Sequence, residues 1–141
     1  MIDSAVFDKH LESINKAQLN VVKGRISQAI GLTLEAVGPR LSLGELCYIR
    51  SNYGSHRLTS AEVVGFKNDR ILLMPLGEVE GIGPGSELIA TGKTLQVKVG
   101  MDLQGRVLDG LGEPLDGKGR IKAVATYPVM NSPPNPLERT R

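Results

Sequence analysis

Short apolar runs separated by turn residues constrain the fold of residues 21–99 more than any other feature of this sequence. Several runs alternate with a period of two, as in Leu95, Val97 and Val99. Because successive side chains of a strand point to opposite faces, this spacing predicts β-strands with one buried face. The predicted strands are residues 21–30, 32–37, 46–50, 58–66, 71–74, 87–90 and 95–99. Short strands at such regular spacing favour a small closed barrel or a sandwich.

Turn residues divide these predicted strands. Asn68-Asp69 is expected to form a hairpin turn, and Gly38-Pro39 is expected to close the second strand. Gly24 lies inside the first strand, where an isolated glycine indicates a bulge or bend. Only 4% of the residues are aromatic, so Val, Ile and Leu must fill the core, and branched side chains of this kind suit strands.

Residues 1–20 follow a different pattern and predict an amphipathic helix. Gly and Pro are absent from this stretch, and Phe7, Leu11 and Ile14 follow helical spacing with Val6 beside them. A helix this short needs a surface for its apolar stripe. That surface is its own domain, another protomer, another protein or a lipid interface.

The chain changes character again in residues 100–141. Residues 106–108 are a candidate for one further strand, and Gly-rich turns follow it. The run from Ser132 to Pro136 contains three prolines and is expected to be extended, as a linker or a surface strap. We therefore expect three regions: a helix at 1–20, a barrel at 21–99, and a linker at 100–141.

No stretch of the sequence has the pattern of a catalytic, cofactor or metal site. Residues 91–94, TGKT, resemble the end of a phosphate-binding loop, but GxxxxGK[ST] needs glycine where Glu87 stands, so we expect a hairpin turn. Glu78 and Glu80 read as surface charge, and GIGPG at 81–85 as a loop. His10 and His56 have no partner at metal-ligand spacing.

Composition narrows the class of protein. Cys47 is the only cysteine, so no intramolecular disulfide can form, and its apolar neighbours predict a buried thiol. The net charge of +2 and the few aromatic residues argue against nucleic-acid binding. The sequence has no signal peptide and no apolar run of membrane-spanning length. These features favour a cytoplasmic protein.

The sequence GRVLDGLGEPLDGKG at 105–119 resembles the segment that joins the N-terminal barrel to the nucleotide-binding domain in rotary-type ATPases. The following PPNPLERTR is similar to the protein-export branch, the ATPases of type III secretion, and most similar to the flagellum-specific ATPase. The resemblance covers roughly residues 21–141. It implies a mainly β fold: a six-stranded closed barrel after an N-terminal helix, with an extended Pro/Gly-rich linker after it.

The resemblance also implies a function for the longer parent protein. Such ATPases hydrolyse ATP with Mg as homohexamers at the cytoplasmic face of the inner membrane, and they release cargo from export chaperones for delivery to the export gate. The barrel then serves assembly, and the helix binds a stator-like regulator or the membrane through Val6, Phe7, Leu11 and Ile14. The family's catalytic residues would all lie beyond Arg141, so we expect this chain alone to fold, to lack ATPase activity and to be largely monomeric.

Three alternatives remain open from sequence. The nearest is the same module of a virulence injectisome ATPase. A subunit of a proton-translocating rotary ATPase and a free-standing nucleic-acid-binding barrel are less favoured. The first two differ from the flagellar interpretation only by resemblance, whereas the third would require binding of single strands in a basic groove lined by aromatic side chains.

Overall fold

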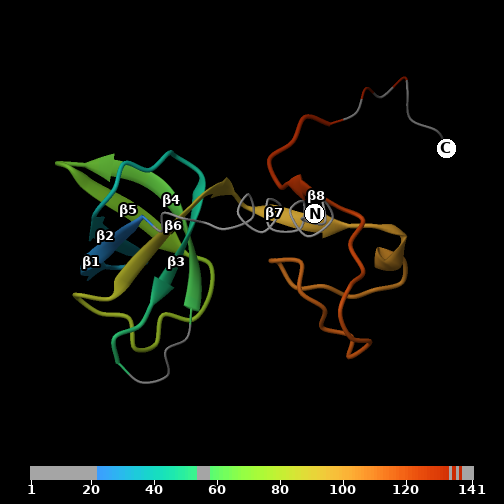
Figure 1. The fold of residues 1–141 in the computed structure, drawn as a ribbon, viewed down its shortest axis with the longest axis horizontal. Helices are drawn as coiled ribbons and strands as arrows, with labels where there is room; N and C mark the ends of the chain where they lie inside the picture. Colours follow the sequence, from blue (N-terminus) through green and yellow to red (C-terminus); the bar gives the residue numbers. More distant parts are fainter. Residues whose placement is uncertain (1–21, 54–57, 134, 136, 138–141) are drawn as a thin grey trace, which may run out of the picture.

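The computed structural model describes residues 22–53, 58–133, 135 and 137 (Figure 1). The predicted helix at 1–20, with its stripe of Val6, Phe7, Leu11 and Ile14, lies outside the described residues. So does part of the proline-rich run. The helical element with described bounds is one 3-10 turn, η1, at Met101–Leu103.

Six antiparallel strands close into a barrel, in the spatial order β1-β2-β5-β4-β3-β6 with β6 paired back to β1. The strands are β1 (Lys23–Ile30), β2 (Thr33–Val37), β3 (Glu45–Arg50), β4 (Leu58–Lys67), β5 (Arg70–Pro75) and β6 (Glu87–Thr94). The prediction of a mainly β, six-stranded closed barrel is therefore confirmed. Closure pairs both edges of every strand, so the barrel has no open edge.

The barrel interior is filled by small and branched side chains. Alternation along each strand sends every second residue inward, as the pattern of buried Leu34 and Ala36 in β2 shows. The buried apolar residues are Ile26, Leu34, Ala36, Cys47, Ile49, Ala61, Val63, Ile71, Leu73 and Leu88. Each Leu, Ile or Val removed from water in this way stabilises the fold by roughly 1.5–3 kcal/mol.

The hairpin between β4 and β5 turns at Asn68 and Asp69, as predicted. Both residues have positive φ, 48° and 58°, which is the geometry of a two-residue type I′ turn. Asn and Asp tolerate this left-handed conformation better than other non-glycine residues. The turn fixes the register in which Lys67 pairs with Arg70.

A bulge or bend was predicted at Gly24, and the bulge is wrong. The register of β1 and β2 shifts between Ile26 and Gln28 instead, so the extra residue is Ser27. Gly24 lies where β1 and the end of β2 approach closely: a Cβ built on it would be 2.7 Å from the Val37 carbonyl oxygen. A side chain cannot fit there, which is the physical reason for glycine at this position.

The hairpin turn predicted at residues 91–94 is also wrong. These residues continue β6, and the five residues from Ala90 to Thr94 lie opposite only the three residues from Glu45 to Cys47 on β3. The sequence TGKT is thus a bulge at the barrel rim, with Gly92 at φ +67°. The strand predicted at 95–99 exists as β7 (Gln96–Val99), but it leaves the barrel and pairs with β8 (Ala125–Pro128), a strand that the sequence did not predict.

Residues 100–124 connect β7 to β8 and run as loops beside the two-stranded sheet (Figure 1). The predicted strand at 106–108 is wrong: only one isolated bridge forms, between Leu108 and Pro114. The turn that begins at Asp109 reverses the chain too soon for a longer ladder. The expected extended linker is not confirmed, because much of this region folds into the sheet, η1 and tight turns.

Candidate functional site: the stapled loop and the barrel surface

No catalytic constellation is found among the residues that the structure describes. They contain no group of three or more His, Cys, Asp or Glu side chains able to hold a metal ion. None of their helices is long and apolar enough to span a membrane. His10, His56 and the stripe of Val6, Phe7, Leu11 and Ile14 lie outside the described residues, so these positions keep the status of predictions.

At the TGKT bulge, the backbone N–H of Gly92 already has a protein acceptor. It donates to Oε1 of Glu45 at 2.9 Å, while the other carboxylate oxygen accepts the N–H of Ser42 at 3.0 Å. Glu45 is only 8% exposed. The Thr91 hydroxyl donates to the Leu46 carbonyl at 2.5 Å. The geometry is that of a strand bulge pinned by a buried carboxylate, and no helix follows it as a phosphate site requires.

Cys47 is fully buried in the barrel, as predicted. Burial, together with the charge of neighbouring Glu45, raises the pKa of its thiol to about 11. The thiolate is the reactive form, so this thiol is held in its unreactive form at neutral pH. Cys47 is therefore a core residue, not a nucleophile.

The loop between β5 and β6 packs against the barrel core through Ile82. Glu78 and Glu80 are exposed on it, as predicted, and the Glu78 carbonyl accepts a hydrogen bond from the Thr59 hydroxyl at 2.9 Å. The glycine-rich part packs against the segment that follows β3, where a Cβ on Gly81 would lie 2.6 Å from the Tyr53 carbonyl oxygen. GIGPG is thus a packing loop, and its glycines permit the close approach of two backbones.

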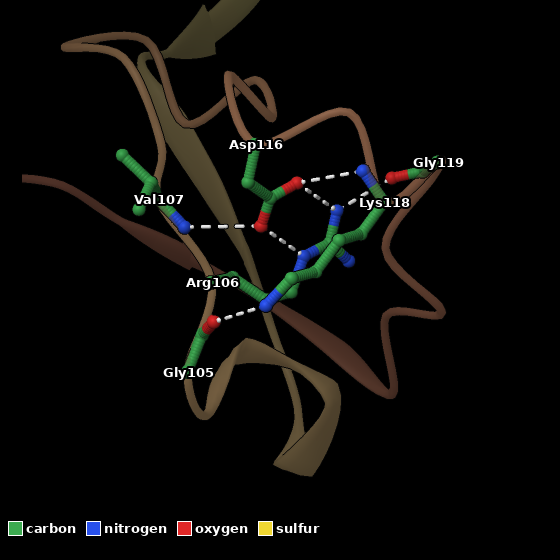
Figure 2. Close-up of polar contacts among 6 residues, drawn as sticks. All are labelled: Gly105, Arg106, Val107, Asp116, Lys118 and Gly119. Atoms are coloured by element: carbon green, nitrogen blue, oxygen red, sulfur yellow. Dashed lines mark hydrogen bonds and ion pairs between the residues drawn. The ribbon is translucent and has the colours of Figure 1, made fainter.

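The most highly connected polar cluster of the described chain holds the loop at 105–119. Figure 2 shows the side chain of Arg106 against Asp116: Nε lies 2.6 Å from Oδ2, and a second guanidinium nitrogen lies 3.0 Å from Oδ1. The same second nitrogen donates to the Gly119 carbonyl at 2.6 Å. Such two-pronged pairing of arginine and carboxylate is stronger and more directional than a single contact. We call this loop, residues 105–119, the stapled loop.

Backbone groups complete the cluster in Figure 2. Asp116 also accepts the N–H groups of Val107 at 3.1 Å and Lys118 at 3.0 Å, and the Lys118 ammonium donates to the Gly105 carbonyl at 3.0 Å. The ion-paired side chains are only 10% and 7% exposed. The hydrogen bond from Arg106, followed by the two backbone N–H groups, holds the pKa of Asp116 well below its usual range.

Sequence reasoning missed this pair. The alternation of Asp and Gly in LDGLGEPLDGKG predicted turns, and it identified Asp116 only as a turn residue. The nine residues between Arg106 and Asp116 follow no helical or strand periodicity, so no local rule predicts that the two side chains meet. The two side chains meet because the fold brings their two loop segments together.

The described residues after the barrel, 95–133, which we call the tail, carry many exposed apolar side chains. Met101, Val107, Leu115, Val124, Tyr127 and Met130 are each more than half exposed. A two-stranded sheet with little buried surface is marginal by itself in water. The exposed apolar side chains and the marginal sheet together favour packing of this region against another part of the protein or another protein.

A charged cluster lies on the outer face of the barrel. The carboxylate of Glu87 in β6 forms two ion pairs with described residues. Its Oε1 lies 2.6 Å from Nζ of Lys23 in β1, and its Oε2 lies 3.0 Å from a guanidinium nitrogen of Arg50 in β3. Arg25 lies opposite Glu87 in the β1–β6 register. The pKa of Glu87 is lowered, and the hydrogen bond from Lys23 is the largest cause. Three cations around one carboxylate leave this face positive.

Known proteins share both parts of the chain. Residues 26–92 match the ATP synthase alpha/beta family, beta-barrel domain. The flagellum-specific ATP synthase of Bacillus subtilis (strain 168) is 47% identical over 116 residues, which is 82% of this chain and 26% of that protein. The flagellum-specific ATP synthase of Pseudomonas aeruginosa is 38% identical over 131 residues, 92% of this chain and 29% of that protein.

Another relative is a type 3 secretion system ATPase, from Xanthomonas euvesicatoria, 43% identical over 116 residues, which is 82% of this chain and 26% of that protein. The chain thus spans less than a third of the length of these curated relatives. Their similarity extends past the barrel, because 116 to 131 aligned residues exceed the stretch from 26 to 92. The closed barrel and these matches together show that the chain belongs to the ATP synthase alpha/beta family, of which it carries the β-barrel domain.

Proposed function

We propose that this chain is the N-terminal assembly and docking module of an ATPase that energises type III protein export, with flagellar export the favoured system. The observation that carries the proposal is the similarity to flagellum-specific ATP synthases, which reaches 47% identity and covers the tail as well as the barrel. Type 3 secretion system ATPases follow at 40% and 43%. An injectisome ATPase is therefore the second candidate.

The chemistry proposed for the whole protein is ATP hydrolysis with Mg in a homohexamer. It would act at the cytoplasmic face of the inner membrane, release cargo from export chaperones and deliver it to the export gate. This chain would contribute assembly and docking, and no catalytic or cofactor-binding residue. The buried Glu45 at the TGKT bulge supports that division, because its carboxylate takes the backbone donor that a phosphate would need.

Two surfaces support an assembly role. The positive face around Lys23, Arg25 and Arg50 is suited to an acidic surface of a neighbouring subunit. The exposed apolar side chains of the tail, among them Met101, Val124 and Tyr127, are suited to packing against another domain of the whole protein. The relatives are much longer than this chain, which leaves length for such a domain. Both surfaces would be covered in a complete, assembled enzyme.

Deletion of the gene that encodes this chain tests the function of the parent directly. We expect the host to lose flagellar filaments and swimming, and to regain both when the gene is supplied on a plasmid. Normal filaments in the deletion strain, together with loss of effector secretion, would assign the protein to an injectisome. Normal filaments with normal secretion would remove both candidates.

The docking stripe is tested by the substitution Leu11→Asp. A carboxylate in the centre of the stripe of Val6, Phe7, Leu11 and Ile14 should weaken binding of the purified stator-like regulator by at least about tenfold, since burying an unpaired charge is costly. Isothermal titration measures the affinity. Asn15→Asp adds the same charge on the polar side of the predicted helix and serves as the control. If Leu11→Asp lowers the thermal midpoint sharply and leaves binding intact, the stripe packs on its own domain.

A further inference from the structure

A concave pocket of about 600 Å³ lies at the end of the barrel formed by the β4–β5 hairpin and the loop after β2. Its size is within the range of ordinary ligand pockets. Its lining includes Pro39, Arg40, Leu41, Phe66, Lys67 and Arg70. We call it the hairpin pocket. It is separate from the stapled loop and from the charged cluster at Glu87.

The bulge in β4 is what places an aromatic ring in this pocket. The β4–β5 register shifts between Val63 and Gly65, and beyond it Phe66 pairs with Ile71. Ile71 is a core residue, so Phe66 shares the inward face of the sheet. Without the extra residue, Gly65 would take that face instead, because side chains alternate along a strand. Among the residues that the structure describes, Phe66 at this barrel end remains 54% exposed.

The cations of the pocket are not neutralised by the described part of the chain. Arg40, Lys67 and Arg70 form no ion pair with any described carboxylate. Asp69, at the tip of the hairpin, is the single acidic residue of the lining. Elsewhere on the barrel, by contrast, Lys23 and Arg50 are paired with Glu87.

The frame around these side chains is firm. The hairpin turns through the two left-handed residues Asn68 and Asp69, and the ladder continues to the last pair, Lys67 and Arg70. Leu41, on the facing loop, packs against the buried core. A rigid frame lowers the entropy lost on binding, so the pocket is preorganised for a ligand.

We propose that the hairpin pocket binds an acidic, amphipathic peptide segment of a partner protein. An apolar side chain of the segment lies against Phe66 and Leu41, and its carboxylates pair with Arg40, Lys67 and Arg70. Clusters of basic residues recognise acidic motifs in this way. The carboxylate of Asp69 among the cations disfavours a continuous polyanion, and the net charge of the chain, +2, is too small to attract nucleic acid or an anionic membrane by itself. A short peptide with spaced carboxylates fits both observations.

The test is a fluorescence-anisotropy titration of the full chain with labelled synthetic peptides that combine several Glu with Leu and Phe at varied spacing. Scrambled peptides with Gln in place of Glu serve as ligand controls. We expect saturable, salt-sensitive binding of at least one Glu-containing peptide. The double substitution K67E/R70E should weaken it by at least about tenfold, because hydrogen bonds to charged groups contribute strongly. F66A should weaken it as well.

The matched control is R120E/K122E, which reverses two exposed cations on the tail and should leave binding unchanged. Circular dichroism of each variant confirms that the barrel is folded. Binding of no peptide, or an equal loss in both double variants, would overturn the proposal. So would tighter binding of phosphatidylglycerol vesicles or of a single-stranded oligonucleotide that K67E/R70E abolishes, since either would assign the pocket to another class of partner. The inference does not depend on the export function proposed above.

Discussion

The barrel and the tail of this chain are stabilised by different physical means. Every buried residue that the structure describes lies between Gly24 and Leu88, and no described residue beyond Leu88 is buried. The barrel has a closed ladder and an apolar core. The tail has a two-stranded sheet and the polar cluster of Arg106 and Asp116. The barrel is therefore held by its apolar core, whereas the shape of the tail depends on a few directional contacts.

The largest effect is expected in the barrel core. Ile49→Ala removes a fully buried side chain and leaves a cavity, which should lower the free energy of unfolding by roughly 2–5 kcal/mol. Leu32→Ala, at a side chain that is 85% exposed, should change it by less than about 0.5 kcal/mol. Urea denaturation followed by circular dichroism measures both. Equal losses in the two variants would contradict a core confined to the barrel interior.

A smaller effect is expected at the close approach of β1 and β2. In Gly24→Ala the new methyl group meets the Val37 carbonyl oxygen at 2.7 Å, and the resulting strain should lower the free energy of unfolding by about 1–3 kcal/mol. Gly110→Ala is the matched control in the tail, where a Cβ would meet nothing within 4 Å. Thermal unfolding of both variants shows the difference. A neutral Gly24→Ala would mean that the strands separate at no cost.

Asp116→Asn should change the free energy of unfolding of the whole chain least. Its clearest effect should be on hydrogen exchange within the stapled loop. The substitution removes the charge from the staple, so amide protons of the stapled loop should exchange faster while those of the barrel strands do not change. Hydrogen exchange followed by NMR resolves the two regions. Asp69→Asn, which removes a carboxylate at an exposed position outside the stapled loop, should leave the amides of Val107 and Lys118 unaffected. Faster exchange throughout the barrel would show that the two regions unfold as one.

The acid response of the same carboxylate follows from its lowered pKa. A group with a depressed pKa contributes stability that is present above its unfolded pKa, about 3.9 for Asp, and that is lost as pH falls through the folded value. The stapled loop should therefore stay closed at pH values where ordinary aspartates are already protonated. Chemical shifts of the Val107 and Lys118 amides, followed during acid titration, report the opening. A midpoint at the ordinary aspartate pKa would contradict the described geometry.

Local patterns were sufficient to predict the barrel strands and the hairpin at Asn68 and Asp69. Period-two alternation and turn chemistry act over a few residues, so they are legible in a sequence. The errors arose where a distant partner decides the conformation. Gly24 was assigned to a bulge because its real constraint, the Val37 carbonyl, lies across the sheet. TGKT was assigned to a turn because the buried carboxylate that pins its bulge belongs to Glu45, on another strand.

The sequence by itself determined a mainly β chain with a buried Cys47. It also contained the segment at 105–119 that resembles the rotary-type ATPases and the segment at 133–141 that resembles their protein-export branch. Only the tertiary structure decided which strands close the barrel, where β7 goes, how Arg106 meets Asp116 and why Phe66 lies at an open barrel end. The physical reason is the separation in sequence between the residues that interact. Alternation and turn geometry are properties of neighbouring residues, whereas closure, ion pairing and pocket formation depend on residues brought together only by the fold.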